Sequence, residues 1–163
     1  MSESCTVIVT NNSGRSLDAV AVWYAPDGGV PDDMSQIPPT VAASNLANGA
    51  SIRGTTPIMS FSPVDYWIGG VLFEGDGTNY VLCGVDGETG KEFEVSDGST
   101  ITFVINAYTA GTTNQKNDVT IHYSEGSDGS AQLLHEGLGR LADFTAGALR
   151  EIAEHTVGEL LAA

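Results

Sequence analysis

The chain has 163 residues, 41% of them hydrophobic, which suits one domain with a proper core and is too apolar for a disordered chain. Its 21 acidic residues outnumber its six basic ones and give a net charge of −15. This charge argues against nucleic acids and anionic membrane surfaces as partners, because both are bound through Lys and Arg.

The N-terminal residues predict two strands and then a long loop. Thr6–Thr10 alternates in polarity, Asn11–Gly14 is a turn by composition, and Leu17–Tyr24 follows as a second strand, so we expect an N-terminal hairpin. Ala25–Ala50 holds four prolines and predicts a loop, which at this length is usually functional or disordered. Ser51–Phe61 predicts a strand that Pro57 confines to a sheet edge.

The strongest pattern lies between Asp65 and Gly84. Two β-favouring runs, Asp65–Glu74 and Asn79–Cys83, flank a Gly-Asp-Gly-Thr turn, which indicates a β-hairpin. Both faces of the first run are apolar, as in a strand covered on each side. Gly69-Gly70 within that run suggests a bulge or a close approach of another backbone.

Three further strands are expected at Lys91–Val95, Thr100–Ala107 and Val119–Ser124. About eight short strands separated by turns are typical of a sandwich or barrel. We therefore predict a mainly β fold, an antiparallel β-sandwich over residues 1–124, with a C-terminal α-helix.

The apolar period changes after Ser124. Residues 125–130 predict a linker and residues 131–163 an amphipathic helix, because apolar side chains recur there on one helical face. This stripe has to pack on its own domain, on another copy or on a membrane. Its candidate interface residues are Leu138, Leu141, Leu149, Ile152 and Leu160.

Residues suited to chemistry are few. Cys5 and Cys83 fall in predicted strands and are expected as buried thiols, able to form a disulfide only if the two strands are neighbours. The sequence holds no nucleophile elbow, phosphate-binding loop or metal-ligand spacing. We therefore expect a protein that is not an enzyme, with no catalytic residues, metal or cofactor. Several Asp-Gly turns have oxygen atoms that could bind Ca²⁺, but we interpret them as ordinary hairpin turns.

Short motifs resemble aegerolysin-like and PUD-type sandwich domains. They are the run Val7–Gly14 followed by Leu17, then Asn48-Gly49 before a strand rich in Ser and Thr, and then Asp65-Tyr66-Trp67. The resemblance covers Cys5–Ser124 and leaves the C-terminal region unmatched. It implies an acidic, non-enzymatic β-sandwich without a signal sequence and, as in aegerolysins, binding to membrane lipids.

Two functional hypotheses follow from these patterns. The first is a lipid- or surface-binding module that engages a neutral lipid or surface ligand through Trp23, Tyr24, Tyr66 and Trp67, although both tryptophans also suit the core. The second is a structural protein that self-assembles into a homo-oligomer, or docks a protein partner, through the C-terminal helix. No run of about 18 apolar residues predicts a transmembrane segment. The N-terminus lacks the pattern of a signal peptide, so a cytoplasmic location or release without a classical signal is expected.

Overall fold

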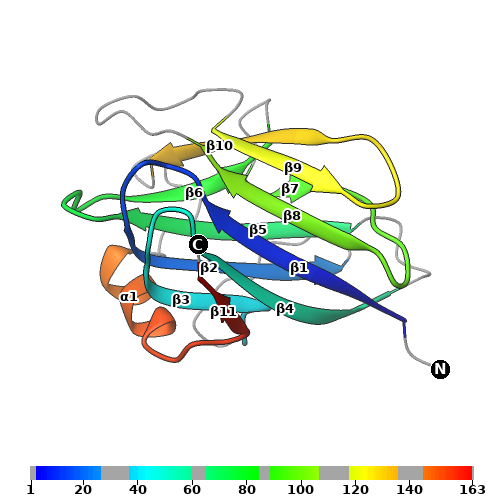
Figure 1. Cartoon of the computed structure of the whole chain (residues 1–163), viewed down its shortest axis with the longest axis horizontal. Coiled ribbons are helices and arrows are strands. Elements are labelled where there is room, and N and C mark those ends of the chain that lie inside the picture. The colour runs from blue at the N-terminus through cyan, green and yellow to red at the C-terminus, as the bar shows by residue number, and fades with distance from the viewer. Residues whose placement is uncertain are drawn as a thin grey trace.

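The computed structural model describes residues 3–26, 37–59, 65–84, 89–106, 118–135 and 145–162. These residues form a mainly β protein, as expected, with one short helix (Figure 1). In chain order the elements are β1 (Glu3–Asn11), β2 (Leu17–Pro26), β3 (Val41–Leu46), β4 (Ser51–Ile58), β5 (Asp65–Phe73), β6 (Asn79–Cys83), β7 (Lys91–Glu92), β8 (Thr100–Ile105), β9 (Val119–Tyr123), β10 (Gly129–His135), α1 (Ala146–Ala153) and β11 (Glu159–Leu161).

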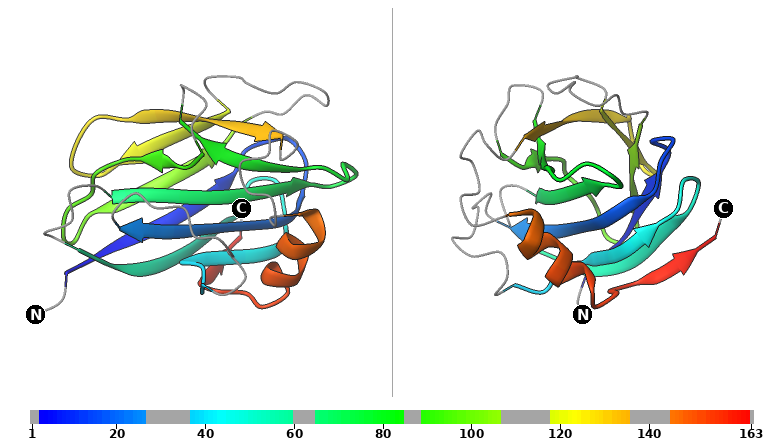
Figure 2. Two further views of the ribbon diagram at one scale, coloured as in Figure 1. Left: turned by 180° about the vertical axis from the view of Figure 1, so that it is seen from behind. Right: turned by 90° about the vertical axis from the view of Figure 1, so that its left-hand side faces the viewer.

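The strands join into one curled sheet in the order β11-β4-β1-β8-β9-β10-β6-β5-β2-β3, with β7 attached to β5. Seen nearly end on, the sheet wraps around a central core (Figure 2). The pairing of β1 with β8 is parallel and the other pairings between these strands are antiparallel. The expected antiparallel sandwich of eight strands is therefore wrong in its detail: the sheet is mixed and has more strands.

Alternation along the strands fills the interior. In β1 the residues Cys5, Val7 and Val9 are buried, and Ile101 and Phe103 of β8 lie in the same core cluster. Nine of the strands contribute to this cluster, so a single apolar interior holds both halves of the sheet together.

A second apolar cluster lies on the outside of β2, β3, β5 and β6. Leu149 and Ala153 of α1 are fully buried in it, and α1 lies against this part of the sheet (Figure 2). Strand β5 is therefore buried on both faces, which confirms the prediction for Asp65–Glu74. Its pairing with β2 is regular at Gly69 and Gly70, so the sheet has no bulge there.

The predicted N-terminal hairpin is wrong. Strand β1 pairs with β4 and β8, whereas β2 pairs with β3 and β5. Residues 11–16 therefore form a corner between two parts of the sheet and not a hairpin turn. The turn residues of the sequence correctly indicated a change of chain direction. They did not indicate the pairing partners of β1 and β2, which are strands distant in the sequence.

The prolines misled the prediction of a loop over Ala25–Ala50. Val41–Leu46 of this stretch is strand β3, with Val41, Ala42 and Ala43 buried, and residues 27–36 lie outside the described part. Strand β4 contains Pro57, and its pairing with β11 covers only Ser51–Arg53. At Pro57 the strand therefore pairs on one side, with Ser4 of β1, as the proline requires.

The C-terminal helix is much shorter than predicted. The expected linker at 125–130 lies largely in the turn between β9 and β10, and residues 131–135 continue β10. The helix covers only Ala146–Ala153, with Thr145 as its N-cap, and β11 follows it. The described part of the expected apolar stripe is thus divided: Leu134 lies in β10, Leu149 and Ile152 lie in α1, and Leu160 lies in β11.

Removal of the Trp67 side chain tests this core. Trp67 has no solvent exposure and its ring lies 5.1 Å from that of Tyr24 and 5.7 Å from that of Phe103, centroid to centroid. Trp67→Ala should lower the free energy of unfolding by about 3–5 kcal/mol, because the cavity cannot collapse fully. Urea denaturation measures this, with the exposed Met59→Ala as a control expected to change stability by about 0.5 kcal/mol or less. An unchanged midpoint for Trp67→Ala would contradict the packing.

Candidate functional site

The two tryptophans predicted to bind ligand pack in the core and make hydrogen bonds within the fold. Trp23 is buried in the outer cluster and its indole donates to the Ile37 carbonyl at 2.8 Å. Trp67 is buried in the interior and donates to the Phe93 carbonyl at 2.9 Å. The core placement of both tryptophans is therefore confirmed.

The two tyrosines are half-buried and also hydrogen-bonded. The Tyr24 hydroxyl donates a hydrogen bond to the buried Asp65 carboxylate and accepts one from the Met59 amide at 3.3 Å. The Tyr66 hydroxyl donates to the Thr89 carbonyl at 2.6 Å. Tyr24 packs toward the interior and Tyr66 toward the outer cluster, so the four aromatics do not share one surface.

The candidate interface residues are also separated. Leu149 of α1 is fully buried, Ile152 of α1 is half-buried, and Leu160 of β11 is 54% exposed. Leu138 and Leu141 lie outside the described residues.

Two of the motifs that resemble aegerolysins, Val7–Gly14 and Asn48-Gly49, meet at the corner between β1 and β2, whereas Asp65-Tyr66-Trp67 pairs with the other end of β2. The Gly14 amide donates to Asn48 Oδ1 at 2.9 Å, and the Gly49 amide donates to the Asn11 carbonyl at 2.6 Å. Their polar groups therefore join two turns, which is a structural role.

Both cysteines are buried thiols, as expected. Cys5 points into the interior cluster and Cys83 into the outer one, so the sheet separates them and they form no disulfide. Burial is the main reason why the pKa of the Cys5 thiol is raised, opposed by its hydrogen bond from Ser99.

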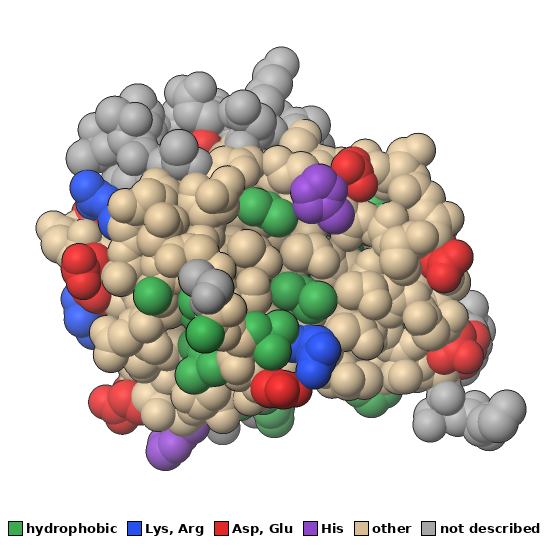
Figure 3. All heavy atoms as spheres, in the orientation of Figure 1, with side chains coloured by type: hydrophobic (Ala, Val, Ile, Leu, Met, Phe, Trp, Pro, Cys, Tyr) green, Lys and Arg blue, Asp and Glu red, His purple; other side chains and the backbone are tan. Residues whose placement is uncertain are grey.

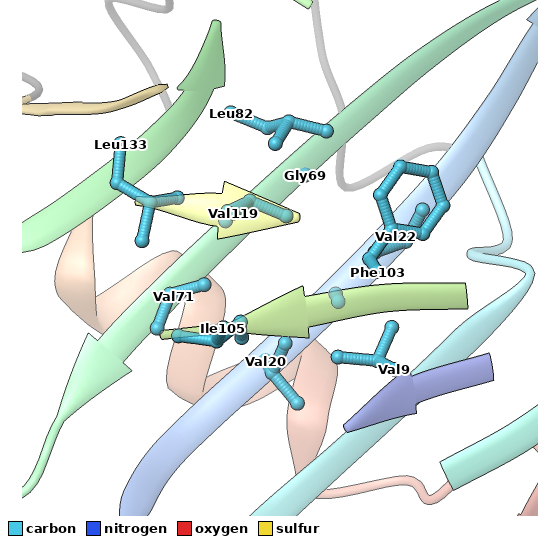
Figure 4. Close-up of a pocket in the computed structure, with 12 residues that line it drawn as sticks. Val9, Val20, Val22, Gly69, Val71, Leu82, Phe103, Ile105, Val119 and Leu133 are labelled. Carbon is cyan, nitrogen blue, oxygen red and sulfur yellow. The ribbon is translucent and has the colours of Figure 1, made fainter. Parts of the chain in front are cut away.

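A small cavity lies in the interior beside Gly69 (Figure 4). Its volume is about 20 Å³ and its lining is apolar, including Val22, Leu82 and Phe103. That is room for about one water molecule and no polar group to hold it, so the cavity is a packing defect and not a ligand site.

The outer face of β4, β1, β8 and β9 has a different character. The residues between the buried positions of these strands point outward, and most carry hydroxyl groups. We call this surface the hydroxyl face; it comprises Thr6, Ile8, Thr10, Ser51, Arg53, Thr55, Thr100, Thr102, Val104, Thr120 and His122.

Strand register arranges the hydroxyl face in cross-strand rows. One row is Thr55, Thr6 and Thr100. The next is Arg53, Ile8, Thr102 and His122, and the third is Ser51, Thr10, Val104 and Thr120. Thr10 and Ser51 share a hydrogen bond of 2.8 Å between their hydroxyl groups.

The two ionisable side chains in the rows of the hydroxyl face, Arg53 and His122, each have a carboxylate partner. Arg53 meets Glu159 of β11 at 2.6 Å, and His122 Nδ1 lies 2.9 Å from Asp128 Oδ2. Figure 3, oriented as Figure 1, shows mainly uncharged atoms over these strands, with few charged side chains among them. On a protein of net charge −15, this face carries no unpaired carboxylate in its rows.

The sequence held a signal for this face that the prediction did not use. Thr6 and Thr10 alternate with buried valines in β1, and Thr100 and Thr102 alternate with Ile101 and Phe103 in β8. Repetition of Thr on the polar side of several strands indicates a common surface, but only the register reveals that those strands are neighbours.

Over the residues in the described ranges, no cluster of three or more His, Cys, Asp or Glu side chains could hold a metal ion. None of the helices described there has the length and apolarity to cross a membrane. Comparison of the chain with models of known protein families gives no match, and comparison with curated protein sequences gives none either.

Two glycine substitutions test the packing. A Cβ on Gly69 would lie 3.4 Å from Leu82 Cβ and 3.5 Å from Val22 Cγ2, which are ordinary contacts. Gly69→Ala should therefore raise the free energy of unfolding by about 0.5–1 kcal/mol, measured by urea denaturation, because it restricts the unfolded chain and fills space beside the cavity. The matched control is Gly158→Ala, where φ is +109° and the new Cβ would lie 2.6 Å from the Arg53 carbonyl oxygen. It should lower stability by about 1–3 kcal/mol, and the opposite order of the two variants would contradict the backbone described here.

The raised pKa of Cys5 predicts a pH dependence. Above the ordinary value of 9.0 the unfolded chain loses the thiol proton while the folded protein keeps it, so stability falls as pH rises through this range. Cys5→Ala should therefore show a shallower loss of stability between pH 8 and pH 10 than the wild type, measured by urea denaturation at each pH. Parallel pH profiles for the two proteins would show that this thiol is not protected by folding.

Proposed function

We propose that this chain is a non-enzymatic binding protein that uses the hydroxyl face to attach to an uncharged or zwitterionic lipid surface. The observation that carries the proposal is that the rows of that face contain no carboxylate, although the protein is strongly acidic, and that Arg53 and His122 in these rows each have a carboxylate partner. The resemblance to aegerolysin-type domains points in the same direction.

Electrostatics favours this face over the rest of the surface. A carboxylate that approaches a lipid head-group region must lose part of its hydration, which costs free energy unless a partner compensates it. Threonine hydroxyls can donate hydrogen bonds to phosphate and carbonyl oxygens and accept them from donors. They can therefore replace hydrogen bonds to water by hydrogen bonds to head groups at little cost in free energy. The net charge of −15 also disfavours anionic membranes.

The aromatic residues are not part of this proposal. Trp23 and Trp67 are buried, and the hydroxyls of Tyr24 and Tyr66 are engaged within the fold. Binding by those side chains would require the core to open, whereas the hydroxyl face is already at the surface.

Vesicle sedimentation tests the proposal. The protein should sediment with phosphatidylcholine vesicles, and less with vesicles enriched in phosphatidylserine. Binding to phosphatidylcholine should change little with salt, because no net charge on the face contributes to it. Absence of binding to phosphatidylcholine, or binding only to the anionic vesicles, would overturn the proposal.

Variants at Val104 locate the binding surface. Val104 is half-buried in a row between Thr10 and Thr120, with no cationic neighbour in that row, so Val104→Glu introduces an uncompensated charge. The bound fraction should fall about tenfold or more, since burying an unpaired carboxylate is costly. Val104→Thr at the same position keeps the face neutral and should bind as the wild type does. Thr156→Glu adds the same charge outside the face and should also leave binding unchanged.

A further inference from the structure

Strand β11 forms one end of the curled sheet. Within the described residues it pairs with β4 alone, in a register that places Leu160 opposite Ile52. The other edge of such a strand offers unpaired amide and carbonyl groups, which can template a further strand. Leu160 is 54% exposed, more than Met59 at 40%, the other exposed large hydrophobic residue of the described part.

We propose that β11 pairs with the β11 of a second copy of this chain, antiparallel and about a two-fold axis at Leu160. A two-fold interface must be complementary to itself, so residue 160 meets residue 160, and residue 159 meets residue 161. Opposite residues of an antiparallel pair lie on the same face of the sheet, so the two Leu160 side chains cover each other.

The same register avoids a clash of charges. Glu159 lies opposite Leu161 of the partner subunit and not opposite its own counterpart. Glu159 is also paired with Arg53 at 2.6 Å, so the centre of the interface carries little net charge. Elsewhere two copies with net charge −15 repel each other, which favours contact at this edge over other surfaces.

Pairing at this edge would also align the hydroxyl faces. Strand β11 is the neighbour of β4, so a continuous sheet would place both faces on one side and roughly double the surface for a lipid layer. This consequence rests on the proposed function, whereas the dimer itself does not.

Sedimentation equilibrium of the full chain tests the dimer. The wild type should show a reversible monomer–dimer equilibrium that tightens as salt is raised, because salt screens the repulsion between acidic copies. A wild type that stays monomeric at high protein concentration and high salt would overturn the proposal.

Two matched variants locate the interface. Leu160→Lys removes the apolar contact at the axis and places like charges opposite each other, so the dimer should weaken about tenfold or more. Met59→Lys changes the other exposed large hydrophobic residue of the described part, beyond the far end of β4, and should leave the equilibrium unchanged. Equal effects of the two variants would overturn the proposal.

Cross-linking gives a second readout. With diamide as the oxidant, two Leu160→Cys thiols on the axis should form an intermolecular disulfide, whereas Met59→Cys should remain monomeric. The native Cys5 and Cys83 are buried and do not compete. A Leu160→Cys protein that cross-links no better than Met59→Cys would exclude this register. Val104→Glu should dimerise as the wild type does, so a failure of lipid binding and a failure of dimerisation are distinguishable.

Discussion

The buried amide of Asn11 fixes the corner on which the sheet depends. Its Nδ2 donates to the carbonyls of Arg15 and Leu46 at 2.8 and 2.9 Å, and its Oδ1 accepts the Ser13 hydroxyl at 2.7 Å. The Asn11 side chain has no solvent exposure. It supplies hydrogen bonds to backbone groups that have no strand partner at the turn and that water cannot reach. The chain can therefore leave β1 and enter β2 in another part of the sheet, which closes the interior from both sides.

This arrangement gives the molecule two unlike exteriors. On β2, β3 and β5 the outward residues are mostly apolar, and Ala19, Ala21 and Ala42 are small enough for α1 to lie close to the sheet. On β4, β1, β8 and β9 the outward residues are mostly hydroxylic and meet solvent directly. A sheet face that needs no cover and has no carboxylate in its rows is the part of an acidic protein best able to lie on a neutral surface.

The sequence predicted the strands well and their partners poorly. Alternation defines β1 and β8 locally, because each buries every second side chain in the interior. Alternation within a strand does not indicate which other strand pairs with it. The parallel pairing of β1 with β8 and the rows of the hydroxyl face could therefore not be predicted. Strand β3 was missed because its Ala and Ser residues have weak strand preference and prolines precede them. The helix was overextended because Leu134 and Leu160, which lie in strands, fall by chance on the helical period of Leu149.

The C-terminal segment changes which edges the sheet exposes. Val157 exchanges two backbone hydrogen bonds with Ala42, at 3.0 and 2.9 Å, and so covers β3 at that point. Gly158, with φ at +109°, then lets the chain turn onto β4, where a side chain would strike the Arg53 carbonyl. The eight-residue β4 is thereby replaced as the end of the sheet by a strand of three residues. Short edge strands limit uncontrolled pairing, so the segment leaves the sheet with an edge that is too short to nucleate a growing sheet.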